Sequence, residues 1–370
     1  MNGYGEAACR STSIDQRNSN GGVLSAFVYS GSVGELESPA AAIASIFAAE
    51  LGVPTVGLDD NFFDLGGDSL MAENLVLAVQ QRFDVGLQTA VLLEAPTPRD
   101  LARLVGTTSH PARRLIVPVI GSRGAEPLAM VHGVSGSPLF ANRFGERLKQ
   151  RYRLLAVRGM GIERGEEPYS DRAEMIASYF EGLKAATGKV PLVVGGICMG
   201  GIIAMELGRL AWEATGRRPR LVLIDPPPLG SYWMRPDRDN SMSERRRRRL
   251  DHHVLYWRSL NAMFERTGFG LTRAGRLARH KFFKKTLTRA LAGFTPPRYP
   301  CDMLVIASSE WGGATVGQFR EWAEGNGRLH TVVMPGTHDG FREANMDAID
   351  GEIIRFLDER GSDDNPPSAR

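Results

Sequence analysis

The sequence predicts a small helical domain followed by a larger α/β domain whose sheet is mostly parallel. Two patterns along the 370 residues support this fold class. Between residues 36 and 106, apolar side chains recur at helical spacing, among them Ile43, Ile46, Phe47 and Leu51. From residue 115 to residue 360, short apolar segments alternate with helical stretches, which is typical of a parallel sheet covered by helices.

In the first domain we expect a helix over the apolar stripe, a second helix ending near Phe83, and a last helix beginning at Thr97-Pro98-Arg99-Asp100. That tetrapeptide combines a capping threonine, a proline at the first helical position and an acid in the first turn.

In the second domain the expected strands span residues 116–120, 127–132, 152–157, 191–195, 220–225, 302–307 and 329–334. Helices are expected near 138–150, 171–186, 199–214, 316–325 and 345–359. Residues 229–296 interrupt this alternation with their own helical period, and we interpret them as a lid inserted over the site. Residues 1–35 are interpreted as a flexible leader, 107–114 as a polar linker and 361–370 as a disordered tail.

The composition favours a cytoplasmic protein. The three cysteines, Cys9, Cys198 and Cys301, are too few and too scattered for a disulfide framework. We see no signal peptide in the first 35 residues, and no run approaches the ~20 apolar residues of a membrane helix. The net charge of +3 does not by itself argue for nucleic acid, so neither nucleic acid nor a membrane is expected as a partner.

Residues 194–201 read Val-Gly-Gly-Ile-Cys-Met-Gly-Gly, a G-x-S-x-G pattern with cysteine in place of serine. An apolar strand precedes the pattern and a helix follows it, as in the sharp strand-to-helix turn that exposes a nucleophile in α/β-hydrolases. Glycines on both sides of Cys198 allow the close backbone approach that such a turn requires. The alternative, a buried cysteine on a glycine-rich turn, does not explain the order of strand, turn and helix.

The first domain contains Asp60-Asn61-Phe62-Phe63-Asp64-Leu65-Gly66-Gly67-Asp68-Ser69-Leu70. This segment resembles the carrier proteins of nonribosomal peptide and polyketide synthases, over roughly residues 37–105. The resemblance implies a small four-helix bundle and a 4′-phosphopantetheine arm attached to Ser69 by a phosphopantetheinyl transferase. A serine at a helix start also meets a dipole that favours a phosphate. An ordinary helix-capping serine is the alternative.

From about residue 115 to 360 the chain resembles the type I thioesterase domains that release products at the end of such assembly lines. The resemblance implies an α/β-hydrolase fold and a triad in the order nucleophile, acid, base. Carried over to matching positions, it gives Cys198, Asp225 and His338, where the family's usual nucleophile is serine.

The residues around the acid and the base support these assignments. Asp225 ends an apolar strand and is followed by Pro226-Pro227-Pro228. His338 follows the strand 329–334 on a short Pro-Gly-Thr loop before the last helix, and no other histidine has this context. Glu310, in the loop after strand 302–307, stays open as the alternative acid.

Acyl transfer also needs hydrogen-bond donors for the developing oxyanion. The resemblance implies the backbone N–H of Met199, which follows the nucleophile, and one from the loop 132–136, most plausibly that of Val134. His132 in the same loop is expected to have a structural role.

Cysteine as the nucleophile changes the expected outcome. A thiol at a helix N-terminus beside a histidine favours a thiolate–imidazolium pair. Transfer from a phosphopantetheine thioester to Cys198 would keep the acyl group activated as a thioester. Members of the resembled family with this substitution are associated with strained rings such as β-lactones and β-lactams.

We therefore expect a carrier–thioesterase didomain of natural-product (antibiotic) biosynthesis that works with upstream synthase modules. It would accept an acyl or peptidyl chain on Ser69, transfer it to Cys198 and release it by cyclisation or by amide or ester formation. Hydrolytic or editing release to a free acid, a cysteine hydrolase of the dienelactone type, and a non-catalytic acyl carrier or shuttle are the alternatives.

The charges of the predicted lid and of the first domain are opposite. Residues 229–296 hold 16 Lys and Arg against 5 Asp and Glu, whereas residues 35–105 hold 11 acids and 3 arginines. Their attraction could steer the carrier toward the active-site mouth. A solvated basic helix face is the alternative.

Overall fold

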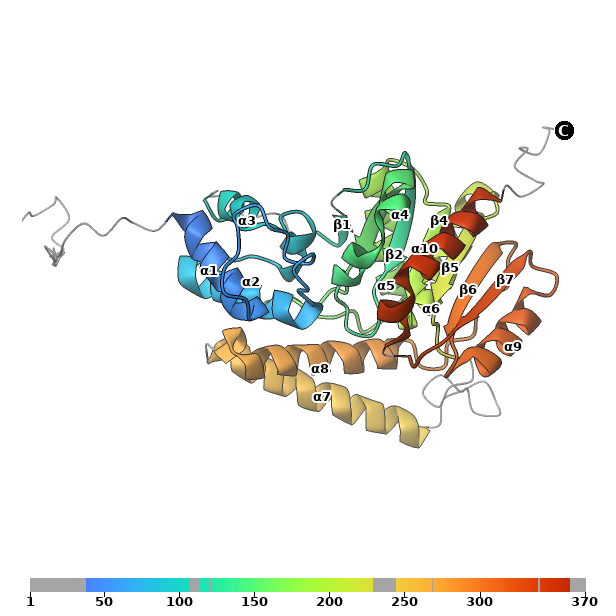
Figure 1. Ribbon diagram of the computed structural model, residues 1–370. Helices are drawn as coiled ribbons and strands as arrows, with labels where there is room; N and C mark the ends of the chain where they lie inside the picture. Colours follow the sequence, from blue (N-terminus) through green and yellow to red (C-terminus); the bar gives the residue numbers. More distant parts are fainter. Residues whose placement is uncertain are drawn as a thin grey trace, which may run out of the picture. The chain divides into compact units, whose positions relative to one another are not determined.

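A computed structural model describes residues 38–106, 114–119, 121–228, 244–267, 269–338 and 340–359 (Figure 1). The predicted leader 1–35, the tail 361–370 and most of the linker 107–114 lie outside the described residues.

The first domain consists of α1 (Pro39–Leu51), α2 (Ser69–Phe83), the 3-10 helix η1 (Thr89–Leu93) and α3 (Pro98–Val105). Within these described residues, three α-helices and one 3-10 helix thus stand where the sequence predicted four helices. Phe47 and Phe62 are fully buried, with their rings edge to face at 5.5 Å. The Thr97 side chain accepts the N–H of Asp100, so α3 begins where its capping pattern predicted.

The second domain is built on a seven-stranded sheet, in the order β1-β3-β2-β4-β5-β6-β7. The strands are β1 (Ile116–Pro118), β2 (Glu126–Val131), β3 (Tyr152–Val157), β4 (Val193–Ile197), β5 (Arg220–Ile224), β6 (Asp302–Ser308) and β7 (Leu329–Met334). Only the pairing of β1 with β3 is antiparallel. The prediction of a largely parallel sheet is confirmed, and β3 and β7 have the predicted bounds.

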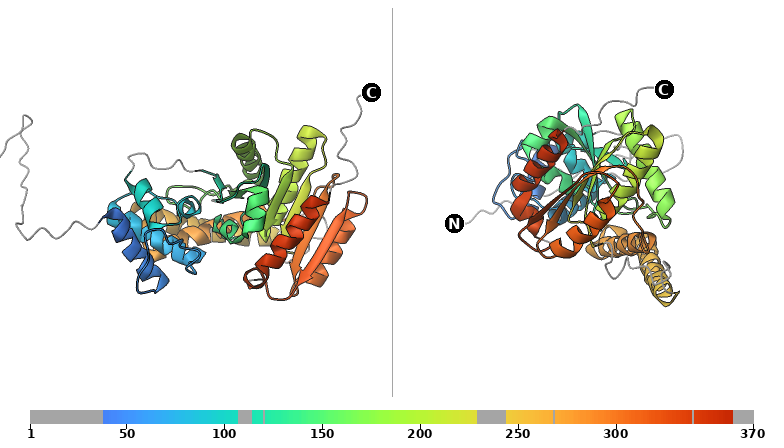
Figure 2. Two further views of the ribbon diagram at one scale, coloured as in Figure 1. Left: turned by 45° about the horizontal axis from the view of Figure 1, so that its top comes forward. Right: turned by 90° about the vertical axis from the view of Figure 1, so that its right-hand side faces the viewer.

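Helices cover both faces of this sheet (Figure 2). They are η2 (Leu139–Arg143), α4 (Glu146–Arg151), α5 (Arg172–Thr187), α6 (Met199–Thr215), α9 (Gly312–Ala323) and α10 (Phe341–Asp358). Helix α10 contacts α4, and α5 contacts α6. Tyr299 links α9 to α6, because its ring lies edge to face with Trp322 and its hydroxyl donates to the Met205 carbonyl.

Several predicted elements have different bounds, among them α10, which starts four residues earlier than predicted. The helix predicted at 138–150 is interrupted because Phe144 is extended and the Asp350 carboxylate accepts the N–H of Gly145. Strand β4 starts and ends two residues later than predicted, so that it also includes Gly196 and Ile197. Helix α9 starts earlier than predicted, at Gly312, where a Cβ would lie 2.8 Å from a methyl carbon of Val333.

The segment inserted between β5 and β6 contains α7 (Glu244–Arg266), the 3-10 helix η3 (Phe269–Leu271) and α8 (Arg273–Ala290). We call these three elements the helical insertion. Helices α7 and α8 pack against each other along their lengths (Figure 1). The first residues of the predicted lid, 229–243, lie outside the described residues.

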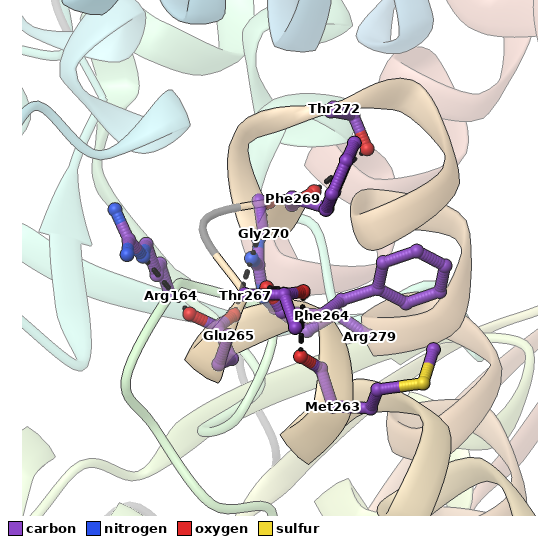
Figure 3. A network of polar contacts seen from close by, with 9 residues as sticks. All are labelled: Arg164, Met263, Phe264, Glu265, Thr267, Phe269, Gly270, Thr272 and Arg279. Carbon is purple, nitrogen blue, oxygen red and sulfur yellow. Dashed lines mark hydrogen bonds and ion pairs between the residues drawn. The ribbon is translucent and has the colours of Figure 1, made fainter.

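A charged network ties the helical insertion to the rest of its domain (Figure 3). Glu265 at the end of α7 accepts from Arg164 Nε at 2.9 Å and from Arg279 Nη2 at 2.7 Å. The same Arg279 nitrogen donates to the Gly270 carbonyl at 3.0 Å. Arg279 is buried, whereas the Arg164 side chain is about half exposed. Glu265 is therefore the counter-charge of a buried cation.

We predict that Glu265→Ala lowers the free energy of unfolding by ~3 kcal/mol, because the Arg279 guanidinium would stay buried without its counter-charge. Arg164→Gln removes the exposed partner of the same carboxylate and should lower the free energy of unfolding by less than about 1 kcal/mol. Urea unfolding of the three proteins measures both values. Equal losses in the two variants would contradict this division of roles.

Candidate active site

Cys198 lies at the sharp turn between β4 and α6, as the sequence predicted. Its backbone has φ 52° and ψ −121°, a conformation that non-glycine residues rarely adopt and that costs about 1–3 kcal/mol. Its N–H donates to the Ile224 carbonyl at 2.9 Å, which extends the β4–β5 pairing by one residue. The turn is thus strained and held by the sheet.

Two glycines make this turn possible. A Cβ on Gly196 would lie 2.1 Å from the Gly200 carbonyl oxygen, and a Cβ on Gly200 would lie 2.4 Å from the His132 carbonyl oxygen. Both separations are far below contact distance, so no side chain fits at either position. The first turn of α6 therefore lies directly against the ends of β4 and β2.

Asp225 and His338 lie together at the carboxyl edge of the sheet. Asp225 follows β5, is fully buried and has φ 45°. Its Oδ2 lies 2.5 Å from Nδ1 of His338, and its Oδ1 accepts the Ser308 N–H at 2.7 Å. The Glu310 carboxylate instead accepts the backbone N–H of His338 at 2.7 Å. Of the two candidate acids, Asp225 contacts the imidazole and Glu310 holds the loop.

The Cys198 side chain also lies close enough to the His338 imidazole to affect its pKa. Partial burial lowers the pKa of His338. The interactions with Asp225 and Cys198, together with their charges, outweigh burial and raise that pKa from 6.5 to about 9. The structure therefore brings together the three residues predicted as a triad and favours an imidazolium near neutral pH.

The indole of Trp311 stacks on the His338 imidazole, with centroids 3.8 Å apart and planes inclined by 17°. It limits the imidazole to one orientation and favours its positive charge. Trp311 was not predicted from the sequence, because a lone tryptophan after a strand has no spacing that links it to a histidine 27 positions later.

The loop 132–136 also reaches the nucleophile. A Cβ on Gly133 would lie 3.7 Å from the Cβ of Cys198. Gly136 N–H donates to the Gly133 carbonyl, so Val134 stands in a tight turn beside the thiol. Met199 is the first residue of α6, where backbone N–H groups lack helical acceptors. Both expected oxyanion donors therefore belong to segments that contact or flank Cys198.

His132 is completely buried. Its Nδ1 donates to the Gly133 carbonyl at 2.7 Å and its Nε2 accepts from the Tyr179 hydroxyl at 2.8 Å. Burial lowers its pKa to about 4, so the ring is neutral near pH 7. These contacts agree with the structural role expected from the sequence.

In the first domain, Ser69 is the first residue of α2 and follows a tight glycine turn. Gly66 has φ 91°, and a Cβ on Gly67 would lie 2.3 Å from the Phe62 ring. The Asp68 carboxylate accepts the Met71 N–H at 2.8 Å, so Asp68 has the helix-capping position that the sequence analysis considered for Ser69.

Among the described residues, no group of His, Cys, Asp and Glu could hold a metal ion. Nor is any helix in the described parts of the chain both long and apolar enough to cross a membrane.

Comparison with known proteins identifies both domains. Residues 41–105 match the phosphopantetheine attachment site family, and residues 126–266 match the thioesterase domain family. A dimodular nonribosomal peptide synthase of Bacillus subtilis (strain 168) is 29% identical over 184 residues, 50% of this chain and 8% of that protein. An indigoidine synthase of Streptomyces lavendulae is 28% identical over 185 residues, 50% of this chain and 14% of that protein.

Among solved structures, a four-domain nonribosomal peptide synthetase bound to AMP and glycine is similar over 90% of this chain and 27% of that chain. The TM-score is 0.52 and the identity 19%, which shows a shared fold. The chain spans 3% to 21% of the length of the curated relatives that it matches.

The chain thus combines a carrier domain with a thioesterase domain of α/β-hydrolase fold. The carrier domain is of the type that bears covalent 4′-phosphopantetheine, as the sequence predicted.

The raised pKa of His338 leads to a stability prediction. A histidine whose pKa is 6.5 in the unfolded chain and about 9 in the folded one stabilises the fold fully below pH 6.5. This contribution is lost as the pH rises through 9. We therefore expect the stability advantage of the wild type over His338→Gln to be largest near pH 6 and to shrink progressively up to pH 9.5.

Urea unfolding at several pH values measures this difference. His330→Gln, at an exposed position on β7, is the control and should show no such trend. A constant difference between wild type and His338→Gln would contradict the raised pKa.

Proposed function

We propose that the carrier domain accepts an acyl or peptidyl chain on a phosphopantetheine arm at Ser69 and that Cys198 takes the chain over and releases it by cyclisation or by amide or ester formation. The observation that carries this proposal is the grouping of Cys198, His338 and Asp225 at the carboxyl edge of the sheet, where Asp225 is hydrogen-bonded to His338 and Cys198 acts on the pKa of the same imidazole. It stands in the same chain as a carrier domain.

The residues around Ser69 fit the arm. As the first residue of α2, Ser69 would place the phosphate at the positive end of the helix dipole. Asp68 caps the helix, so modification of Ser69 would leave the cap in place. When bound, the arm supplies the thiol that carries the acyl group as a thioester.

In the proposed reaction, Cys198 sulfur attacks the carbonyl carbon of a thioester substrate. His338 holds the thiol proton while the new C–S bond forms, and Asp225 stabilises the imidazolium. The N–H groups of Val134 and Met199 donate to the oxyanion. The tetrahedral intermediate collapses, the bond to the departing thiol breaks, and His338 returns the proton to that thiol.

Release repeats these steps with a different nucleophile. An amine or hydroxyl gives its proton to His338 and attacks the carbonyl of the acyl–Cys198 thioester, and the Cys198 sulfur leaves. Since the first step exchanges one thioester for another, little of the activation of the acyl group is lost. This supports release to an amine or a hindered hydroxyl, for which an oxoester would be a poorer donor.

Loading of the chain by a phosphopantetheinyl transferase with an acyl-coenzyme A tests this proposal. We expect the arm on Ser69 and, with time, acyl mass on Cys198, both located by peptide-mapping mass spectrometry. Cys198→Ala should keep the load on Ser69 and show no transfer. A wild type that releases only free acid in the presence of amine acceptors would support the hydrolytic alternative, and an arm that never forms on Ser69 would contradict the carrier assignment.

Contacts between α2 and α8 support a role of the helical insertion in holding the carrier domain. The Glu73 carboxylate lies 4.0 Å from Arg276 Nη1 and 3.4 Å from His280 Nε2, and Arg276 Nη2 donates to the Asn74 side chain at 2.6 Å. Burial raises the pKa of Glu73 to about 7, although Arg276 opposes this rise. These contacts agree with the attraction considered from the opposite charges, and we propose the insertion as both lid and docking element.

We predict that Arg276→Glu slows transfer from a loaded Ser69 by roughly tenfold, because a repulsive pair would replace an attractive one beside Glu73. Acylation of Cys198 by a small free thioester should change little, since it needs no docking. Lys281→Glu, at an exposed position of α8, makes the same change of charge and is the control. Single-turnover mass spectrometry measures the rate of transfer from Ser69 and the rate of acylation by the free thioester. If transfer from Ser69 were slowed equally in the two variants, the change in net charge would explain the effect, and the contact with Glu73 would not.

A further inference from the structure

A half-open pocket of about 130 Å³ lies beside the candidate triad. Ile197 and Ile224 line it, and each directly precedes a triad residue, the cysteine and the aspartate respectively. Ser135, which follows the expected oxyanion donor, and Arg342, four residues after the triad histidine, also line it. Consecutive Cα atoms are about 3.8 Å apart, so two of the lining residues are direct chain neighbours of Cys198 and Asp225.

The pocket lies on the face of the sheet that α10 covers. Ile197 and Ile224 are register partners on β4 and β5, so their side chains point to the same face. Arg342 and Met346, four residues apart on either side of a kink at Asn345 in α10, complete that side, and η2 contributes Phe140. The pocket is therefore enclosed by the strand ends that present the triad and by the start of α10.

The lining of this pocket includes cationic side chains. Two arginines, Arg143 and Arg342, line it, and none of the lining residues is acidic. Nε of Arg342 is buried and has no hydrogen-bond partner among the described residues. A buried donor of a charged group left without an acceptor is costly, and a bound anion would supply that acceptor.

Two serines add neutral donors. Ser135 Oγ accepts the Ser137 N–H at 3.3 Å, and Ser137 Oγ accepts the Leu139 N–H at 3.4 Å. Each hydroxyl also has a hydrogen to donate, which a second acceptor could take. The remaining walls are aromatic and aliphatic, which strengthens a charge pair by excluding water.

We propose that this pocket binds a carboxylate on the acyl chain, so that the thioesterase domain selects acyl groups bearing a carboxylate a few bonds from the thioester carbonyl. Its volume equals about four water molecules and accommodates a short carboxylate-bearing side chain. The inference rests on the proposed function only in its assumption that the acyl group is attached at Cys198.

Binding of unreactive analogues tests the pocket without relying on catalysis. The probes are pantetheine amides of succinate, glutarate and adipate, in which NH replaces the thioester sulfur, each paired with its methyl ester. Isothermal titration calorimetry on the full chain should give a Kd about 10- to 100-fold lower for the best carboxylate than for its ester. Arg342→Gln should abolish this preference, and Arg342→Lys should keep part of it.

Arg355→Gln is the matched control, because Arg355 lies on the same helix, is exposed and pairs with Glu352. It should keep the full preference. No preference in the wild type for any chain length, or equal losses in Arg342→Gln and Arg355→Gln, would overturn the proposal. Acylation of Cys198 by a neutral butyryl thioester, measured by mass spectrometry on the same proteins, tests the proposed function separately.

Discussion

The close approach of the first turn of α6 to the ends of β4 and β2 is the constraint on which the candidate site depends. A Cβ on Gly196 or Gly200 would meet backbone atoms at 2.1 Å and 2.4 Å, so these positions accept only glycine. This approach forces Cys198 into a conformation with positive φ and places the start of the helix directly after the thiol. The cost of that conformation, about 1–3 kcal/mol, is offset by the parallel pairing of β4 with its two neighbours. The nucleophile is thus oriented by the packing of main chain against main chain.

The pairing of the strands also fixes the positions of Asp225 and His338. Asp225 N–H donates to the Ile306 carbonyl, and the Asp225 carboxylate accepts the N–H of Ser308, so the acid is fixed at both ends by β6. The loop after β7 brings His338 to the same edge, where Glu310 binds its backbone N–H. A parallel sheet aligns the carboxyl ends of its strands. Residues from three distant stretches of sequence therefore meet at one edge of the sheet.

Short sequence patterns predicted the elements that depend on residues close together in the sequence. The elbow motif located Cys198 between a strand and a helix, and the alternation of apolar segments gave β3 and β7 their bounds. Prediction from the sequence failed where contacts between residues far apart in the sequence determine the structure. A glycine pair does not predict a helix start, yet α9 begins at Gly312, where the side chain of Val333 leaves no room for a Cβ. Two further features could not be predicted from the sequence either: the stacking of Trp311 on His338, and the pocket that Arg342 and Ile197 both line. Each joins segments that only the fold brings together.

The influence of Cys198 on the pKa of His338 also bears on how one imidazole could serve both halves of the proposed reaction. Two influences hold the proton on His338 in the free protein, the Asp225 carboxylate and the Cys198 sulfur. Acylation of Cys198 would remove the second influence, because a thioester sulfur carries no charge and accepts hydrogen bonds weakly. Burial and Asp225 would then act alone on the ring, and its pKa would fall from about 9 toward a range in which the imidazole accepts a proton. The same residue would thus be an acid when the departing thiol needs a proton and a base when the incoming amine or hydroxyl must lose one.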